Sequence, residues 1–232
     1  MSSLYREARA ALKESDLRPK KRLGQNFLVH DSVLDSIMRL VEPADDDEIL
    51  EIGPGLGSLT RRLVERARRV WAVEVDPKLI AKLREGELCA HPALELIEGD
   101  VLKLPLEEIL PARRIKVVAN LPYSISTPVL FRIFEMSERF SFLVLMVQRE
   151  VAERMASVPG TKSYGALSVW CQVYGRITAK VPVAPEAFFP RPKVRSMVLK
   201  IELRPEPLAA ADEIPVLREL VRAAFGRRRK TL

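Results

Sequence analysis

The sequence predicts an α/β fold in which a mainly parallel sheet carries helices on both faces and has an antiparallel edge. After residue 45, short runs rich in β-branched and apolar residues alternate with longer amphipathic runs, a rhythm typical of parallel strands joined by helical crossovers. Two strand-like runs lie close together late in the chain and predict the antiparallel edge. With 232 residues, 47% of them hydrophobic, the chain can form one large domain with a small appendage.

The parallel part of the sheet is expected to follow an N-terminal helix. Residues 31–41 have the apolar periodicity of a helix, with Asp31 or Ser32 as its cap. A helical stretch over 56–67 follows the first strand, and Pro77 suits the first turn of the next helix. The runs expected to form the parallel strands are 48–52, 70–75, 94–98, 115–119 and 142–147.

The pattern changes after the fifth strand. Helices are expected over 148–156 and 164–175. The alternating runs 176–183 and 194–203 flank the segment PEAFFPRP, and they are predicted to pair antiparallel at one edge of the sheet.

Two units are predicted, a first domain over residues 1–203 and a second unit over 204–232. The second unit opens with RPEPLAAADEIP, which has the composition of a linker, and continues with an amphipathic helix over 216–226 that ends at Gly226. One helix and a basic tail are too little for a domain. The second unit is therefore either the beginning of a small helical appendage or a chain that has been cut short.

Positive charge is in excess, with 38 Lys and Arg against 31 Asp and Glu, a net charge of +7 and a pI near 9.6. This balance suits a polyanionic partner, although on its own the signal is weak. The basic residues cluster in RPKKR (18–22) and GRRRK (226–230). Solvated tails and phosphate-contacting patches explain these clusters equally well until a site is found nearby.

Several kinds of site and location are disfavoured. Cys89 and Cys171 are far apart and lack Cys or His partners at ligand spacing, which argues against a disulfide and against a metal site. The N-terminal MSSLYREARA has no apolar signal segment, and the longest apolar run, FSFLVLMV, is too short to cross a bilayer. We therefore expect a cytoplasmic protein with reduced cysteines.

A glycine-rich turn, EIGPGLGSLT (51–60), lies between the first strand and the first crossover helix. Glycines there permit positive φ and a close approach of ligand to backbone, and ligands of such sheets bind outside the carboxyl ends of the strands. A dinucleotide fingerprint would need a glycine where the chain has Ser58, and the lysine of a P-loop is missing. Gly53 and Gly55 are therefore expected to bind a ligand without a pyrophosphate.

Polar residues follow the next three strands at the same rim. Glu74 ends the second strand, where a carboxylate can accept hydrogen bonds from both hydroxyls of a ribose. Asp100 follows the third strand and can accept from an adenine amino group, and Asn120 ends the fourth. A lone Asp after a strand is more often a turn or cap, but four such strand ends in register favour a nucleoside site. S-adenosylmethionine, an adenosine joined to a methionine, meets these requirements.

Seven motifs resemble those of the bacterial ribosomal RNA adenine N6-dimethyltransferases that act on the small subunit. They run in order from about residue 18 to the end of the chain, which makes the resemblance specific. The motifs are KKRLGQNFL (20–28), EIGPGLGSLT (51–60), VEVD (73–76), EGD (98–100), NLPYSIST (120–127), LMVQREVAERM (145–155) and FFPRPKVRS (188–196).

The resemblance implies a Rossmann-like, S-adenosylmethionine-dependent methyltransferase fold. It also implies that two methyl groups are transferred to each of two adjacent adenosines near the 3′ end of small-subunit ribosomal RNA, in an immature subunit during ribosome biogenesis. A fuller helical C-terminal domain would follow FGRRRKTL (225–232), so the resemblance suggests truncation and weakened RNA binding.

Individual roles are implied as well. Asn26 and Leu28 would approach the cofactor from the N-terminal segment, and Asn120 would bridge cofactor and substrate; without the resemblance, a helix-entry cap would be favoured for Asn26. The implied cofactor-binding residues are Asn26, Leu28, Gly53, Gly55, Glu74, Asp100 and Asn120. The expected partner is small-subunit ribosomal RNA, and the protein is expected to be a monomer that binds no membrane and no metal. The expected RNA-binding residues are Lys20, Lys21, Arg22, Arg191, Lys193, Arg227, Arg228, Arg229 and Lys230.

The segment NLPY suggests how an amine could be activated. The N6 of adenine is a poor nucleophile because its lone pair is delocalised into the ring. Acceptors on its hydrogens, the side-chain oxygen of Asn120 and the main-chain carbonyl of Leu121, would localise that pair towards the methyl donor, while Pro122 stiffens the turn. Tyr123 could stack on a flipped base. No general base of shifted pKa is required, so catalysis would rest mainly on positioning.

The Pro-punctuated segment FFPRP could clamp the base from the opposite face. One of its two phenylalanines is expected in the core, and Phe188 is the one expected to stack on the base.

Two alternatives remain open, and two further classes are disfavoured by the sequence. A large-subunit adenine dimethyltransferase of the antibiotic-resistance type would share the glycine turn and an NLPY-like motif, and a mainly non-catalytic ribosome assembly factor would explain the basic ends. A nicotinamide oxidoreductase is opposed by Ser58 and by NLPY. A DNA adenine methyltransferase is disfavoured because its motif has Pro-Pro after the first residue.

Overall fold

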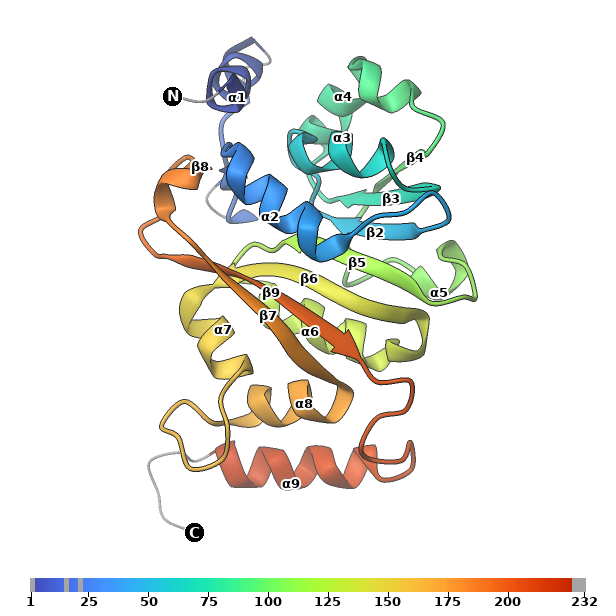
Figure 1. The fold of residues 1–232 in the computed structure, drawn as a ribbon, viewed down its shortest axis with the longest axis vertical. Coiled ribbons are helices and arrows are strands. Elements are labelled where there is room, and N and C mark those ends of the chain that lie inside the picture. The colour runs from blue at the N-terminus through green and yellow to red at the C-terminus, as the bar shows by residue number, and fades with distance from the viewer. Residues whose placement is uncertain (1–2, 15–16, 21–22, 227–232) are drawn as a thin grey trace.

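The computed structural model describes residues 3–14, 17–20 and 23–226. In Figure 1 a twisted sheet crosses the molecule, with helices on both sides. The strands are β1 (Phe27–Leu28), β2 (Glu48–Ile52), β3 (Arg69–Glu74), β4 (Leu94–Glu98), β5 (Ile115–Asn120), β6 (Phe140–Gln148), β7 (Gly175–Val183), β8 (Phe188–Phe189) and β9 (Ser196–Leu203). The α-helices are α1 (Ser3–Glu14), α2 (Asp31–Val41), α3 (Ser58–Val64), α4 (Pro77–Glu85), α5 (Leu106–Ile109), α6 (Ser126–Glu135), α7 (Arg149–Met155), α8 (Ala166–Tyr174) and α9 (Ile214–Gly226).

The main sheet has the strand order β4-β3-β2-β5-β6-β9-β7. The first five of these strands pair parallel, and β9 pairs antiparallel with both β6 and β7. The predicted parallel core with an antiparallel edge is therefore confirmed. Because β2, β3, β4 and β5 run in the same direction, their carboxyl ends share one rim of the sheet.

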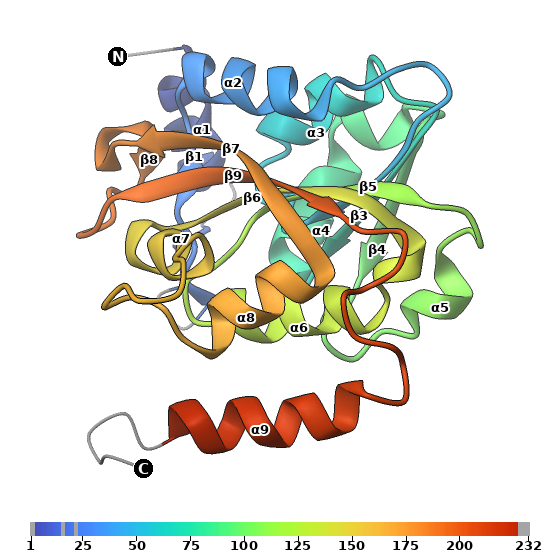
Figure 2. The ribbon, with the colours of Figure 1, turned by 60° about the horizontal axis from the view of Figure 1, so that its bottom comes forward.

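Helices cover both faces, as the alternating pattern predicts. Leu34 and Ile37 of α2 and Leu63 of α3 pack on one face, while α5, α6, α7 and α8 pack on the other. Figure 2 shows α2 and α3 on one side of the sheet and α6 and α8 on the opposite side. The hydrophobic core between the sheet and α5, α6, α7 and α8 is called the second core below, and Trp170 of α8 is buried in it. The hydrophobic runs of the central strands follow from this arrangement, because strands covered on both faces have no polar side.

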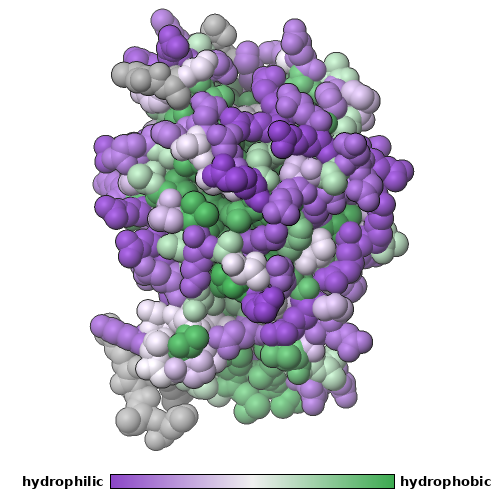
Figure 3. Space-filling model, in the orientation of Figure 1, coloured by the Kyte–Doolittle hydropathy of each residue, from purple (hydrophilic) through white to green (hydrophobic). Residues whose placement is uncertain are grey.

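Helix α9 forms a further layer outside α8. Its Val221 is buried against the second core, whereas Val216 and Leu220 are 62% exposed. Figure 3 shows hydrophobic residues at the lower end of the molecule, where Figure 1 places α9.

A second, two-stranded sheet joins distant parts of the chain. β1 and β8 pair antiparallel, with Phe27 opposite Phe189 and Leu28 opposite Phe188. The amide of Val29 donates to the carbonyl of Ala187 at 2.8 Å and extends the pairing. The segment that precedes α2 is thereby fixed next to the FFPRP segment and to the rim of the main sheet.

Three local predictions need correction. The N-cap of α2 is His30, without a side-chain cap bond, rather than Asp31 or Ser32; Asp31 instead pairs with Arg62 of α3. The second strand covers Arg69–Glu74 instead of 70–75, so Glu74 ends it as expected, and Val75 beyond it is 45% exposed. The first crossover helix is limited to α3, shorter than the stretch 56–67. The helix α1 is an addition, anchored by Ala8 and Leu12.

Candidate active site

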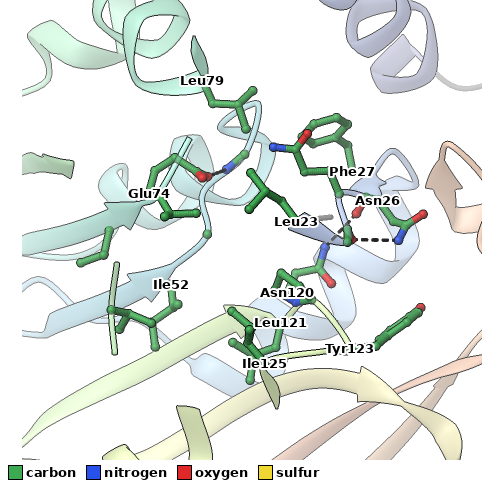
Figure 4. A pocket seen from close by; sticks show the side chains of 18 of the residues that line it. Leu23, Asn26, Phe27, Ile52, Glu74, Leu79, Asn120, Leu121, Tyr123 and Ile125 are labelled. Atoms are coloured by element: carbon green, nitrogen blue, oxygen red, sulfur yellow. Dashed lines mark hydrogen bonds between the residues drawn. The ribbon is translucent and has the colours of Figure 1, made fainter. Parts of the chain in front are cut away.

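A cavity opens at the carboxyl ends of β2, β3, β4 and β5. Ile52 and Gly53 lie at the end of β2, Glu74 at the end of β3, Asp100 after β4 and Asn120 at the end of β5. Figure 4 shows residues of the N-terminal segment closing the opposite wall. That wall is made by Leu23, Gly24, Gln25, Asn26 and Phe27. The four strand ends expected to form one site are therefore brought together.

Glu74 is held with its carboxylate at the glycine turn. The side chain is 5% exposed; its Oε2 accepts from the amide of Gly55 at 3.2 Å, and Oε1 accepts from the amide of Asp76 at 2.9 Å. Burial raises the pKa of Glu74, while the amide hydrogen bonds from Asp76 and Gly55 lower it in part. A glycine is required at position 55, where φ is +59° and an added Cβ would lie 3.1 Å from the ring of Phe27.

Asp76 ties the N-terminal wall to the rim. Its side chain is buried and accepts from Lys20 Nζ at 2.6 Å and from Gln25 Nε2 at 2.7 Å. It also caps α4 through the amide of Lys78. Burial alone would raise the pKa of Asp76, but the hydrogen bonds from Lys20, Gln25 and Lys78 lower it below the ordinary value. The carboxylate therefore stays charged and fastens the wall.

Asn120 and Asn26 are in direct contact where both line the cavity. The amide Nδ2 of Asn120 donates to the main-chain carbonyl of Asn26 at 3.1 Å, and Nδ2 of Asn26 donates to the carbonyl of Gly24 at 3.0 Å (Figure 4). The alternative role of Asn26 as a helix-entry cap is wrong, because its side chain closes its own turn. The Nδ2 bond orients the Asn120 amide and leaves its Oδ1 as an acceptor.

The turn after Asn120 is held from both sides. The amide of Leu121 donates to the carbonyl of Met146 at 3.1 Å, and the hydroxyl of Ser126 donates to the carbonyl of Pro122 at 3.1 Å. Leu121 is 1% exposed, and Pro122 and Tyr123 line the cavity beside Asn120. The four NLPY residues therefore form one wall of fixed geometry.

The structure reverses part of the expectation for FFPRP. Phe188 is the core member of the pair, 3% exposed, although its ring reaches the lining of the cavity. Phe189 is the partly exposed one, with its ring in an edge contact with Tyr5 at 5.3 Å between centroids. Phe188, the residue expected to stack on the base, is thus the core member of the pair, because pairing with Leu28 in β1 turns its side chain inward.

Leu28 and Asp100 also differ from the simple expectation. Leu28 is 7% exposed and lies outside the main cavity, whose lining has Phe27 in its place. Asp100 lines the cavity, but its Oδ1 also accepts from the amide of Leu102 at 3.0 Å and caps its own turn.

One buried carboxyl group beside the cavity was not predicted. Glu51 is 2% exposed, and burial raises its pKa to about 8, with the Thr60 hydroxyl opposing the shift and the carboxylate of Glu74 adding to it. Within the described part of the chain, neither Oε2 of Glu51 nor the Thr60 hydroxyl makes a hydrogen bond of normal distance and angle. A glutamate in the otherwise apolar strand EILEI, next to the glycine turn, is the signal that could have identified it.

Comparison with known proteins identifies the family. The ribosomal RNA adenine dimethylase family matches residues 17–232. The chain belongs to this family. A ribosomal RNA small subunit methyltransferase A from Alkaliphilus oremlandii is 42% identical over 231 residues, which cover 98% of this chain and 80% of that protein. The protein of the same name from Geobacter metallireducens is 46% identical over 219 residues, covering 93% and 79%.

Solved structures of two dimethylase relatives share the fold. A dimethyladenosine transferase from Plasmodium falciparum has a TM-score of 0.74 at 32% identity, with 89% of this chain and 73% of that chain covered. The 23S rRNA methyltransferase ErmE has a TM-score of 0.71 at 29% identity, with 87% and 80% covered. The Rossmann-like methyltransferase fold expected from the sequence is therefore confirmed.

The basic residues of this dimethylase family member divide into three groups. Lys20 already pairs with Asp76, and Arg191 pairs with Glu186. Lys193 is exposed at the edge of the FFPRP segment. The others expected at the RNA lie outside the described residues: Lys21, Arg22, Arg227, Arg228, Arg229 and Lys230.

The described residues contain neither a membrane-spanning helix nor a metal-binding cluster. In the part of the chain that the structure describes, no helix is long and apolar enough to span a bilayer. No group of three His, Cys, Asp or Glu side chains with the arrangement of a metal site occurs among those residues.

Proposed function

We propose that this chain transfers methyl groups from S-adenosylmethionine to N6 of two adjacent adenosines near the 3′ end of small-subunit ribosomal RNA. The product would be N6,N6-dimethyladenosine, formed on an immature subunit during ribosome biogenesis. The observation that carries the proposal is the meeting of Gly53, Glu74, Asp100 and Asn120 at one cavity in a member of the adenine dimethylase family.

The cavity suits S-adenosylmethionine on three grounds. Glu74 presents a carboxylate of the kind that a ribose requires, and Asp100 presents an acceptor for an adenine amino group. Gly55 leaves open the space that a Cβ would fill. The unpartnered Oε2 of Glu51 belongs to a buried carboxyl group that would give up its proton on pairing with the α-ammonium group of the methionine end. When bound, S-adenosylmethionine supplies a methyl group on a sulfonium that leaves as a neutral thioether.

The residues of the NLPY turn would orient the target amine. Oδ1 of Asn120 and the carbonyl of Leu121 accept the two N6 hydrogens of adenine, and the nitrogen lone pair turns from the ring towards the methyl carbon. The new N–C bond forms as the C–S bond breaks, with its electrons passing to sulfur. The methylated amine is then acidic and gives its proton to solvent. Positioning by Asn120 and Leu121 accounts for most of the rate, since no side chain has to remove a proton first.

Aromatic side chains would hold the base. Tyr123 lines the cavity next to Asn120 and would stack on the flipped adenine, and Phe188, which also lines the cavity, would contact the base. The inward position of Phe188 limits it to the edge of the base unless the FFPRP segment shifts.

The basic residues would contact phosphates. Lys193 is exposed and could contact a phosphate directly, and Arg191 would exchange Glu186 for a phosphate. We propose phosphate contacts also for the basic residues outside the described ranges, which are Lys21, Arg22, Arg227, Arg228, Arg229 and Lys230. We also propose that the chain acts as a monomer, in the cytoplasm, and that residues 1–203 form the methyltransferase domain while 204–232 begin a helical appendage.

The decisive experiment is incubation with labelled S-adenosylmethionine and small subunits from a strain that lacks the modification, followed by mapping of the modified adenines. We expect dimethyladenosine at two adjacent positions near the 3′ end of the RNA. Label confined to large-subunit RNA would instead favour the large-subunit alternative; the 23S rRNA methyltransferase ErmE has a TM-score of 0.71 with this chain. Tight binding to immature subunits without any transfer of label would favour the assembly factor.

A further inference from the structure

The aromatic ring next to Asn120 has an anchor in a distant strand. The hydroxyl of Tyr123 and the hydroxyl of Ser196 are 2.8 Å apart and share a hydrogen bond. The backbone of the NLPY turn is fixed by Leu121 and by the Ser126 bond to Pro122, but these contacts do not restrain the far end of the tyrosine ring. Among the hydrogen bonds of the described residues, the bond to Ser196 is the one that restrains it.

Ser196 is itself held rigidly. It is the first residue of β9 and pairs with Gln148 of β6 on one side and Val183 of β7 on the other. Its side chain is 1% exposed, and the adjacent strand end is closed by the amide of Arg149, which donates to the carbonyl of Arg195 at 2.9 Å. Because Ser196 is buried and its backbone is paired on both sides, its hydroxyl is held in place and can fix the orientation of the Tyr123 ring.

The hydroxyl of Tyr123 keeps its proton under all ordinary conditions. Burial raises its pKa above the usual value, and the bond to Ser196 opposes this only in part. The hydrogen bond is thus between two neutral groups, and such bonds make only a modest net contribution to stability. Such a bond orients a ring without making the fold depend on it.

We propose that Ser196 is a positioning residue that fixes the ring plane of Tyr123 against the target base, and that the second methyl transfer depends on it more than the first. This inference rests on the proposed function. An unmethylated adenine presents two N6 hydrogens, to Oδ1 of Asn120 and the carbonyl of Leu121, and these bonds orient it. After the first transfer one hydrogen remains, so orientation of the monomethylated base relies more on the stacked ring.

The test compares Ser196→Ala with Tyr123→Phe, which removes the same hydrogen bond from the other side and keeps the aromatic ring. The matched control is Ser141→Ala, which removes a serine hydroxyl bonded to the carbonyl of Ile115 at the other end of β6. Each variant is assayed on immature subunits under single-turnover conditions, with monomethyl- and dimethyladenosine measured by mass spectrometry after nuclease digestion. Melting temperature and cofactor affinity are measured alongside.

Both single variants should slow the second transfer roughly 3- to 10-fold and accumulate monomethyladenosine, with cofactor affinity unchanged. The double variant should be no slower than either single one, because both remove one bond. Ser141→Ala should give the wild-type product ratio. An unchanged ratio in both single variants, or effects that multiply in the double variant, would overturn the proposal. If Ser196→Ala does not fold, Tyr123→Phe decides alone.

Failure of the proposed function has a different signature. In that case the wild-type protein itself would form no dimethyladenosine in small-subunit RNA, whereas failure of the inference leaves wild-type dimethylation intact and the product ratio of the variants unchanged.

Discussion

The side-chain amide of Asn120 donates a hydrogen bond of 3.1 Å to the main-chain carbonyl of Asn26. The two residues belong to the end of a central strand and to the N-terminal segment that closes the cavity. This bond engages the amide nitrogen of Asn120. Because the amide group is planar, the bond also fixes the direction of its oxygen. The segment before α2 therefore helps to define the acceptor that would meet the substrate.

Replacement of Asn120 by alanine should lower the rate of methyl transfer by about 100-fold or more, because an acceptor aimed at the reacting amine is lost. Cofactor binding should largely persist, since Gly53, Glu74 and Asp100 are untouched. Single-turnover methylation of immature subunits and calorimetric titration with the cofactor separate the two effects. A variant that still dimethylates at a near-normal rate would refute the proposed activation of the amine.

Glu74→Gln should weaken cofactor binding about 10- to 100-fold, because a charged acceptor of hydrogen bonds is replaced by a neutral one. Glu98→Gln is the matched control, since Glu98 lies opposite Glu74 in the register of β4 and β3 but its side chain is 45% exposed. Isothermal calorimetry measures both affinities. If Glu74→Gln binds as tightly as the control, Glu74 does not hold the ribose.

Glu51 should make the free energy of unfolding fall as the pH rises. Its pKa is about 8 in the folded protein against 4.5 ordinarily, so between these values the folded state binds more protons than the unfolded state. The stabilising effect is fully present below pH 4.5 and is lost progressively up to about pH 8, with a slope of at most about 1.4 kcal/mol per pH unit from one proton. Glu51→Gln should flatten the profile of the cofactor-free protein, as measured by urea unfolding at pH 5, 6, 7 and 8. The same pH dependence in both proteins would show that Glu51 does not titrate in this range.

Calorimetry tests the pairing of Glu51 with the cofactor directly. At pH 6.5 a free α-amino group is already protonated, so proton release on cofactor binding would come from the protein. Comparison of buffers with different ionisation enthalpies should reveal release by the wild type and less release by Glu51→Gln. Equal release by the two proteins would assign the protons to other groups.

Gly24→Ala should impair catalysis through Pro122. At Gly24 φ is +60° and an added Cβ would lie 3.0 Å from Cβ of Pro122. Gly160→Ala is the control, because φ is +86° there but nothing lies within 4 Å of the added Cβ. Both variants should lose about 1 kcal/mol of stability through backbone strain, while Gly24→Ala alone should lose methylation activity, roughly 10-fold. Equal activities, measured after correction for the folded fraction by circular dichroism, would mean that the NLPY turn tolerates the displacement.

The sequence was sufficient for the sheet and for the rim that carries the site. Strand and helix periodicities and the turn glycines are local properties, and polar residues at the ends of parallel strands must share one edge. The position of Glu74 beside Gly55 follows from these facts. The contacts of Asp76 with Lys20 and Gln25 do not, because they depend on where a segment without regular structure crosses the rim.

The sequence also did not show which of two neighbouring apolar residues faces the cavity. Phe27 and Leu28, and Phe188 and Phe189, are adjacent pairs in which one side chain lines or approaches the cavity and the other turns elsewhere. In an extended segment successive side chains point in opposite directions, and a shift of one residue exchanges them. Both pairs belong to the two-stranded sheet β1-β8, whose register is a long-range property.

The pairing of β1 with β8 also bears on how the protein is made. During synthesis Phe27 leaves the ribosome roughly 160 residues before its partner, an interval on the order of ten to thirty seconds at ordinary elongation rates. Until the FFPRP segment emerges, the N-terminal wall has no strand to pair with, while β2 to β5 can already form the rim. The nascent chain would thus gain its central sheet first and its enclosed pocket only after the FFPRP segment has emerged, which delays tight cofactor binding until that point.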